Sequence, residues 1–246
     1  MVVSGVESRE VRNAFEYCST VEEWLEARRR GIGGSDAPGV LGLSPWKGPY
    51  SIWVDKSGRA GKRDPPNQQM RLGHKLEPVL HELYQEETGV ELIDHGDYAI
   101  YWGDEPNQFA TLDRVRADGK RIVEFKTTGS DRDWRGEPPL HVVAQVQHQM
   151  SVAQVDECDV AVLFGNPFRF EIFRVYRHDK FVAGLVKSCR RFWELVETGT
   201  PPEVDDSEVT AKALRAMKSE PGTTIDLDPQ VAGWIDRAKS FAQMPV

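Results

Sequence analysis

Two carboxylates and a lysine lie on the strands of a predicted hairpin near the middle of the chain. The stretches 109–117 and 120–127 alternate in the manner of strands, and Asp118-Gly119 joins them. A two-residue type I′ turn at this position sets a register in which Asp113 lies directly opposite Glu124. Directly opposed residues have Cβ atoms about 4.5–5.5 Å apart, so both carboxylates can ligate one divalent cation. The spacing therefore predicts a metal site on this hairpin.

Strand alternation adds Lys126 to the same face as Glu124, while Val123 and Phe125 point into the core. Lys126 would then reach toward a water molecule bound to the metal. The alternative is an ordinary solvated hairpin face on which Lys126 relieves the repulsion between the two acids. Oxygen ligands without a nearby cysteine favour Mg²⁺ or Mn²⁺ over Zn²⁺, and such hard ions suit phosphate chemistry.

A second segment rich in potential ligands is the stretch RRRGIGGSDAPGVLG, residues 28–42. Glycines allow a close backbone approach and arginines bind phosphate with charge-assisted hydrogen bonds, so this stretch could hold a phosphate. The Walker A and dinucleotide-binding glycine patterns are both absent from it. The alternative is structural: the arginines end a helix, Gly31 is its C′ residue, and Ser35 or Asp36 caps the next helix.

Helices and strands alternate along the rest of the chain. Helices are predicted from near Thr20, where Glu23 completes a capping box, over 71–87, and over 181–196. The stretch 138–155 carries no charged residue and predicts a helix that is buried or faces a partner. The remaining predicted strands are 98–102, 160–165 and 170–175.

The length of 246 residues and the composition predict one domain followed by a tail. We expect a cytoplasmic protein, because the sequence shows neither a long apolar run nor a signal-peptide pattern. Three cysteines, Cys18, Cys158 and Cys189, are too few for a four-cysteine metal site. A net charge of -8 excludes a generally basic surface but not a nucleic-acid site confined to a groove or pore.

The order of several motifs resembles that of the lambda-type phage exonucleases, also called YqaJ-like viral recombinases, in the PD-(D/E)XK nuclease superfamily. The motifs are RRRGIGGSD, LGHKLEP, FATLDRV, IVEFKTT, VVAQVQHQM and FWELVETGTPPE. The resemblance implies an α/β (α+β) core in which helices flank a central mixed sheet. It also implies a nuclease domain over 1–203, followed by an acidic linker and helical tail over 204–246.

Residue roles follow from the same resemblance. It implies that Asp113 and Glu124 are metal ligands, that Lys126 is the catalytic lysine, and that Glu77 and Gln145 assist at the site. Two further matches, Arg28 and Ser35, would hold the 5′-terminal phosphate of the digested strand. Two departures from the family pattern are present: Leu112 replaces the usual proline, and His141-Val142 stand where a tyrosine is common.

The implied activity is a 5′-to-3′ exonuclease that uses Mg²⁺, for which Mn²⁺ can substitute. It would digest one strand of linear double-stranded DNA from a 5′-phosphorylated end and leave a 3′ single strand for recombination. Implied partners are DNA ends, two further copies of the chain in a trimeric ring, and a single-strand annealing protein; no membrane is involved. Two alternatives remain: an endonuclease of the same superfamily, and a catalytically silent module that binds DNA ends.

Overall fold

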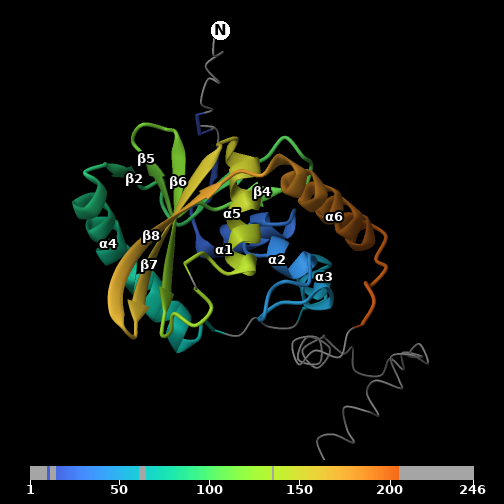
Figure 1. The fold of residues 1–246 in the computed structure, drawn as a ribbon. Coiled ribbons are helices and arrows are strands. Elements are labelled where there is room, and N and C mark those ends of the chain that lie inside the picture. Colours follow the sequence, from blue (N-terminus) through green and yellow to red (C-terminus); the bar gives the residue numbers. More distant parts are fainter. Residues whose placement is uncertain (1–9, 12–14, 61–64, 135, 205–246) are drawn as a thin grey trace, which may run out of the picture.

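A five-stranded mixed sheet organises the molecule (Figure 1). The computed structural model describes residues 10–11, 15–60, 65–134 and 136–204. The strand order in this sheet is β2-β5-β6-β7-β8. The bounds are β2 Leu92–Ile93, β5 Arg114–Arg116, β6 Arg121–Thr128, β7 Glu157–Gly165 and β8 Phe168–Tyr176. Strands β6 and β7 are parallel and the other neighbours are antiparallel, which confirms the predicted mixed sheet.

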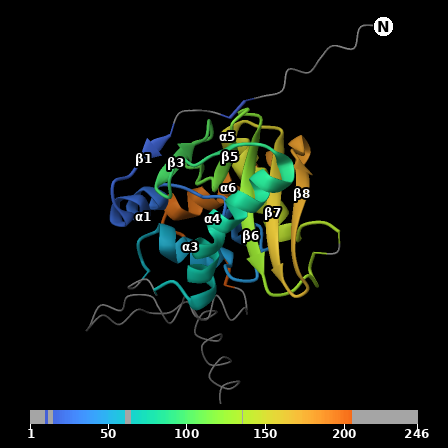
Figure 2. The same cartoon turned by 90° about the vertical axis from the view of Figure 1, so that its left-hand side faces the viewer.

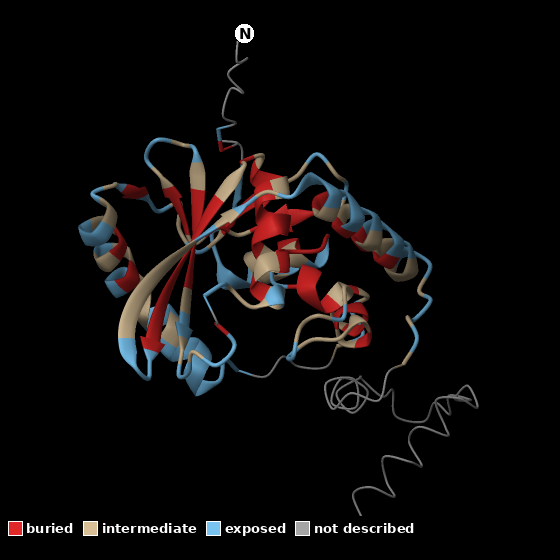
Figure 3. Ribbon diagram, in the orientation of Figure 1, coloured by how far each residue is buried: buried red, intermediate tan, exposed pale blue. Residues whose placement is uncertain are grey.

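One helix covers each face of the sheet. Helix α4 (Gln68–Thr88) packs on one face, with Val123 and Phe125 of β6 in the shared apolar cluster (Figure 2). Helix α5 (Leu140–Ala153) packs on the other face, where Ile122 belongs to the cluster. Strand β6 is therefore buried on both sides, as are most of β7 and α5 (Figure 3). The alternative of a solvated hairpin face is wrong, because Glu124 is only 4% exposed.

The hairpin between β5 and β6 has the predicted register but a different turn. Arg114 pairs with Val123, as the prediction requires. Gly119 has a φ of 67°, whereas Asp118 is not among the residues with positive φ, which a type I′ turn would need. The connection is the four-residue loop 117–120, and this loop is centred on the same point as the expected two-residue turn. For that reason the register is the same.

The predicted strand 109–117 is divided between two sheets. Its first part, β4 (Phe109–Ala110), belongs to a three-stranded sheet with β1 (Glu16–Tyr17) and β3 (Ala99–Trp102). Its last part is β5 of the main sheet. Asp113 lies at the junction, directly before β5.

Three helices form a second layer beside α5 (Figure 1): α2 Ala37–Val40, α3 Pro49–Lys56 and α6 Asp179–Glu197. Helix α1 (Val21–Arg29) packs instead against the three-stranded sheet, where Ala27 joins the apolar cluster of Ile100 and Phe109. The predicted cap of α1 is confirmed, because the Thr20 hydroxyl accepts the Glu23 N–H at 3.2 Å. The Glu23 carboxylate in turn accepts the N–H of Ser19 at 2.8 Å. These two hydrogen bonds fix the N-terminus of the helix that leads into the glycine-rich stretch.

The glycine-rich stretch differs from the structural alternative in its details. Gly31 does not have the left-handed conformation of a helix C′ residue; a Cβ there would lie 2.6 Å from the carbonyl oxygen of Asn107. Asp36 is the N-cap residue of α2, but its side chain makes no capping hydrogen bond. Close packing, not helix termination, thus requires the glycine, and the Asp36 carboxylate is used elsewhere.

The chain after α6 is described only as far as Val204, which packs against the apolar cluster of α3 and α6. The predicted tail over 205–246 lies outside the described residues. None of the described helices combines the length and the apolar character that crossing a bilayer requires. All three cysteines are buried free thiols.

Candidate active site

The two carboxylates predicted to face each other do meet. Asp113 precedes β5, and the register of the hairpin places it across from Glu124. Its Oδ2 atom accepts the backbone N–H of Phe125, the residue after Glu124, at 2.8 Å. Asp113 is half-buried and Glu124 is almost fully buried, so the pair lies where one side opens to solvent.

Three side chains hold the carboxylate of Glu124. Lys126 Nζ and Gln145 Nε2 both donate to Oε1, each at 2.6 Å. Gln149 Nε2 donates to Oε2 at 2.7 Å. Lys126 also donates to Gln145 Oε1 at 3.1 Å, so the lysine and the carboxylate share one amide. We call Asp113, Glu124 and Lys126 the sheet cluster.

Gln149 is a site residue that sequence reasoning missed. Gln145 and Gln149 are four residues apart, and this spacing places both on one face of α5. The pattern was visible in the sequence, but the side chain had no assigned role. In the structure Gln149 is 3% exposed, and its Oε1 atom is buried without a hydrogen-bond partner among the described residues.

Electrostatics distinguish the members of the sheet cluster. Burial and the nearby charge of Glu124 raise the pKa of Asp113 well above its ordinary value. Burial alone would lower the pKa of Lys126, but the charges of Glu124 and Asp113 outweigh it and raise that pKa. When both carboxylates are ionised, the single ammonium leaves a net negative charge, and the ligand atoms are oxygens. This donor set fits a hard divalent cation such as Mg²⁺.

Glu77 lies close to this pair on α4. It lines a cavity of about 290 Å³ together with Asp113. Burial raises the pKa of Glu77, and its Oε1 atom lies 3.3 Å from His74 Nδ1. Ligand atoms of His74, Glu77 and Asp97 all lie within 4.8 Å of one another, an arrangement that could also hold a metal ion. Neither His74 nor Asp97 was among the site residues predicted from the sequence.

The predicted phosphate ligands Arg28 and Ser35 are also brought together. Arg28 Nη2 donates to Ser35 Oγ at 3.1 Å. The guanidinium carbon of Arg28 lies 4.5 Å from the ring centroid of Trp24 and 5.5 Å from that of Phe109. Trp24 lines the same cavity as Glu77 and Asp113. The Arg28–Ser35 pair therefore lies next to the cavity at the sheet cluster.

A buried ion cluster lies beneath that pair. Asp36 is 3% exposed, and its two carboxylate oxygens each receive a lysine Nζ at 2.8 Å: Lys47 on Oδ1 and Lys56 on Oδ2. Lys56 Nζ also donates to the carbonyl oxygen of Arg28 at 2.8 Å. Burial opposes ionisation of Asp36, but the charges of Lys47, Lys56 and Arg28 hold its pKa well below the usual range. We call Asp36, Lys47 and Lys56 the loop cluster.

Packing joins the two clusters. A Cβ on Gly34 would lie 2.9 Å from Cγ of Gln149, the residue that holds Glu124. A Cβ on Gly33 would lie 2.7 Å from the ring of Phe109. The glycines thus let the loop lie directly against α5 and β4.

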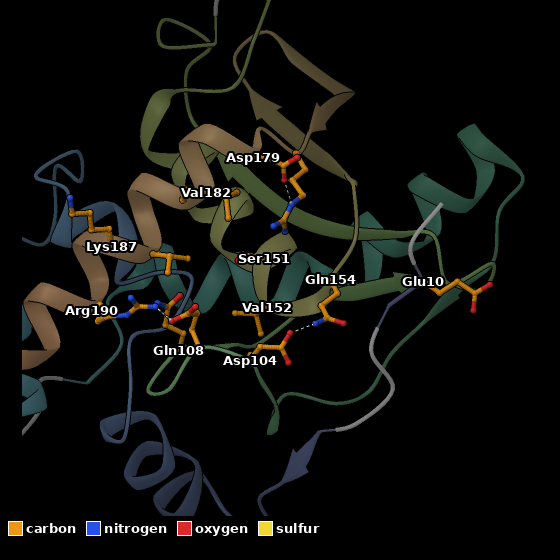
Figure 4. A pocket seen from close by; sticks show the side chains of 15 residues that line it. Glu10, Asp104, Gln108, Ser151, Val152, Gln154, Asp179, Val182, Lys187 and Arg190 are labelled. Carbon is orange, nitrogen blue, oxygen red and sulfur yellow. Dashed lines mark hydrogen bonds and ion pairs between the residues drawn. The ribbon is translucent and has the colours of Figure 1, made fainter. Parts of the chain in front are cut away.

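A larger cavity, of about 1020 Å³, lies elsewhere (Figure 4). It is lined by the last turn of α5, the loop 103–108 and one side of α6. Its charged groups are largely paired: Arg190 with Glu105, Arg177 with Asp179, and Asp104 with Gln154. None of the predicted site residues lines it.

Known proteins are similar to this chain over the segment that contains both clusters. A sequence model of the YqaJ-like viral recombinase domain matches residues 23–156, more than half of the chain. The chain belongs to the YqaJ-like viral recombinase family. Every residue of the two clusters lies inside the matched segment. The protein YqaJ of Bacillus subtilis (strain 168) is 30% identical over 220 residues, which cover 84% of this chain and 66% of that relative.

Solved structures share the fold of this family member. An alkaline exonuclease, LHK-Exo from Laribacter hongkongensis, has a TM-score of 0.60 at 21% identity, over 73% of this chain and 94% of that one. LHK-Exo in complex with dAMP has a TM-score of 0.62 at 20% identity over the same shares. A phage-related exonuclease from Haemophilus somnus 129PT has a TM-score of 0.50 at 10% identity, over 69% and 96% of the two chains. The fold is restriction-endonuclease-like, as predicted.

Proposed function

We propose that this protein is a divalent-metal-dependent exonuclease that digests one strand of linear double-stranded DNA from a 5′-phosphorylated end. The product would carry a 3′ single strand suitable for recombination by strand annealing. The observation that carries the proposal is the sheet cluster, in which Asp113, Glu124 and Lys126 converge beside the buried strand β6. Membership of a viral recombinase family agrees with this role.

The catalytic residues in this proposal are Asp113, Glu124, Lys126, Glu77 and Gln145. Asp113 and Glu124 would hold one or two Mg²⁺ ions, for which Mn²⁺ can substitute. A bound divalent cation would stabilise the extra negative charge that develops on the phosphodiester. Lys126, held as an ammonium, would orient the attacking water and donate a hydrogen bond to a phosphate oxygen.

Two supporting residues keep these groups in place. Gln145 bridges Lys126 and Glu124, so it fixes the lysine relative to the carboxylate. We add Gln149, because it holds the second oxygen of Glu124. Glu77 borders the cavity through which the DNA strand would reach Asp113.

The 5′-phosphate would bind at Arg28 and Ser35. The loop cluster places two lysines on one carboxylate, so the region beneath these residues has an excess of positive charge that favours an anion. Arg28 can form bidentate hydrogen bonds with a phosphate. The similarly folded LHK-Exo is known in complex with dAMP, a nucleotide with a 5′-phosphate.

The assembly in this proposal is a trimeric ring around DNA, which would work beside a single-strand annealing protein in the cytoplasm of a host cell. A ring reconciles DNA binding with a net charge of -8, because basic residues can line the hole while the exterior is acidic. Light scattering of the purified protein gives the number of subunits, and a stable monomer would contradict the ring.

The test uses three DNAs with Mg²⁺: a linear duplex with 5′-phosphates, the same duplex with 5′-hydroxyls, and a closed circular plasmid. We expect loss of the phosphorylated linear duplex, slower loss of the hydroxylated one, and an intact circle. Lys126→Ala serves as the inactive control. Cutting of the circle would indicate an endonuclease instead, and DNA binding without any cutting would indicate a silent end-binding module.

A further inference from the structure

Trp46 is an exposed aromatic residue on an anchored loop. This residue is 69% exposed and lies on the segment between α2 and α3. The hydroxyl of Ser44 accepts the backbone N–H groups of both Trp46 and Lys47 at 3.2 Å. Lys47 in turn forms the ion pair with buried Asp36. The loop is thus fixed to the loop cluster, and its tryptophan is presented to solvent.

The ring of Trp46 lies beside the sheet cluster. Its centroid is 5.0 Å from that of His141, and the two rings are nearly perpendicular at 86°. His141 is in the first turn of α5, four residues before Gln145, which contacts Glu124 and Lys126. Burial and the nearby charge of Lys126 lower the pKa of His141, so this imidazole is a neutral neighbour of the lysine. Trp46 is therefore linked to the loop cluster through Lys47 and contacts α5 one turn before Gln145.

Trp46 offers a large, flat apolar face on an anchored loop, and covering that face with a ligand would be strongly favourable. The perpendicular contact with His141 leaves most of the indole uncovered. A nucleobase is the ligand whose shape fits: every base has a flat π-face, and stacking on an aromatic residue does not depend on sequence. An enzyme that digests a whole strand needs this tolerance.

We propose that Trp46 stacks on a nucleobase within the first two nucleotides of the strand being digested. The inference rests on the proposed function, in which a strand with its 5′-phosphate at Arg28 and its scissile bond at Lys126 would run past this loop. The stacking holds the end nucleotides in line between the two sites. It is an added contact for DNA, independent of the phosphate and the metal.

The test measures equilibrium binding of 5′-phosphorylated duplexes with Mg²⁺, in a Lys126→Ala background so that the DNA persists. Stacking contributes about 1–3 kcal/mol per base, so Trp46→Ala should weaken binding about 5- to 150-fold. Trp46→Phe should recover most of the affinity. The matched control is Phe168→Ala, which removes an aromatic residue that is 81% exposed at the start of β8; it should leave binding unchanged.

A second duplex makes the result specific. In it, the first two nucleotides of the phosphorylated strand are abasic, so there is no base to stack. Trp46→Ala should then change the affinity by less than about twofold, within the usual error of additivity. Equal weakening on both duplexes would overturn the inference, because the tryptophan would then act only through the loop. No weakening on either duplex would also overturn it.

Two further readouts separate this inference from others. If Trp46 instead contacts another copy of the chain, Trp46→Ala will change the subunit number in light scattering, and the inference fails. The protein with native Trp46 is also compared on 5′-phosphate and 5′-hydroxyl duplexes. Absence of a phosphate preference would contradict the Arg28–Ser35 assignment, whereas the abasic comparison would still report on Trp46.

Discussion

The sheet cluster and the loop cluster are both buried arrangements of carboxylates and lysines, but their charge ratios are opposite. In the sheet cluster, Asp113 and Glu124 share one ammonium, that of Lys126. In the loop cluster, Asp36 alone receives two lysines, Lys47 and Lys56. The first therefore has an excess of negative charge and the second an excess of positive charge.

The pKa shifts of the two aspartates follow this difference. The pKa of Asp113 is raised by burial and by Glu124, so its charged form is disfavoured until a cation arrives. Burial acts on Asp36 in the same direction, yet Lys47 and Lys56 lower its pKa well below the usual range. The loop cluster thus ionises its own carboxylate, whereas the sheet cluster needs a bound cation to ionise Asp113. An incomplete charge balance in a buried site is typical of a functional site.

The largest expected effect is on catalysis. Glu124→Gln and Lys126→Ala should each lower the rate of DNA digestion about 10³-fold or more, because each removes a charged group at the reacting phosphate. Initial rates on the phosphorylated linear duplex measure this. Asp113→Asn should fold at least as stably as the parent without metal, since it removes acid–acid repulsion and its amide oxygen can still accept the N–H of Phe125. A strong loss of stability would mean that the sheet cluster is structural, and the contrast between the clusters would fail.

Asp36→Asn, in contrast, should lower the free energy of unfolding. Removing one partner of a buried ion pair costs about 3–5 kcal/mol, because Lys56, whose side chain is only 2% exposed, is left buried without a counter-charge. Urea unfolding gives this free energy. Lys56→Met alone should also destabilise, and the double variant should recover part of the loss, since it leaves no buried Lys56 charge.

The pH dependence of stability gives a second measure of Asp36. Its lowered pKa means that between this pKa and the unfolded value of about 3.9 the unfolded chain binds more protons. The parent protein should therefore lose stability as the pH falls through that window, relative to Asp36→Asn. A constant difference between the two proteins across the window would contradict the ion-pair assignment.

Gln149→Ala tests whether the missed glutamine belongs to the sheet cluster. Residues that orient a metal-binding carboxylate typically contribute 10- to 100-fold, so we expect roughly that loss in metal affinity or activity. Gln147→Ala is the matched control on the same helix, because Gln147 hydrogen-bonds the backbone of Tyr176 and His178 instead. The control should lower stability and spare the rate at saturating metal. Equal effects of both variants on the rate would remove Gln149 from the site.

The smallest expected effect is that of the cation on stability. Mg²⁺ at ten times its dissociation constant should stabilise the protein by about 1.4 kcal/mol, which raises the melting temperature by about 3–5 °C. Asp113→Asn should abolish this shift, and Asp36→Asn should retain it, because only the sheet cluster lacks a cation. A shift retained by Asp113→Asn would move the ion elsewhere, with His74, Glu77 and Asp97 as the next site to test.

Sequence reasoning predicted the parts that depend on local patterns. Strand alternation and the position of Asp118-Gly119 fixed the register of Asp113, although the turn type was wrong, because any symmetric loop about that point pairs the same residues. The uncharged stretch correctly predicted a buried helix over 140–153. The resemblance to a known family named residues whose side chains prove to be in contact, such as Arg28 and Ser35.

Contacts between distant segments could not be predicted in this way. Lys56 and Asp36 meet across twenty residues, and nothing in either local pattern distinguishes a buried lysine from a solvated one at a helix end. Gln149 had the right helical spacing from Gln145, but only the packing of α5 on β6 shows which carboxylate it holds. The break of the strand 109–117 was missed because both halves have strand-like composition.

The contact of Gly34 with Gln149 has a consequence for the length of DNA removed in each step. One rigid helix, α5, touches the loop that would hold the 5′-phosphate and also carries the amides that hold Glu124. The span between the two sites is thus set by close atomic packing and not by a flexible segment. Under the proposed function, this fixed span sets the number of nucleotides between the bound 5′-phosphate and the cleaved bond. Every step should therefore release a product of the same size.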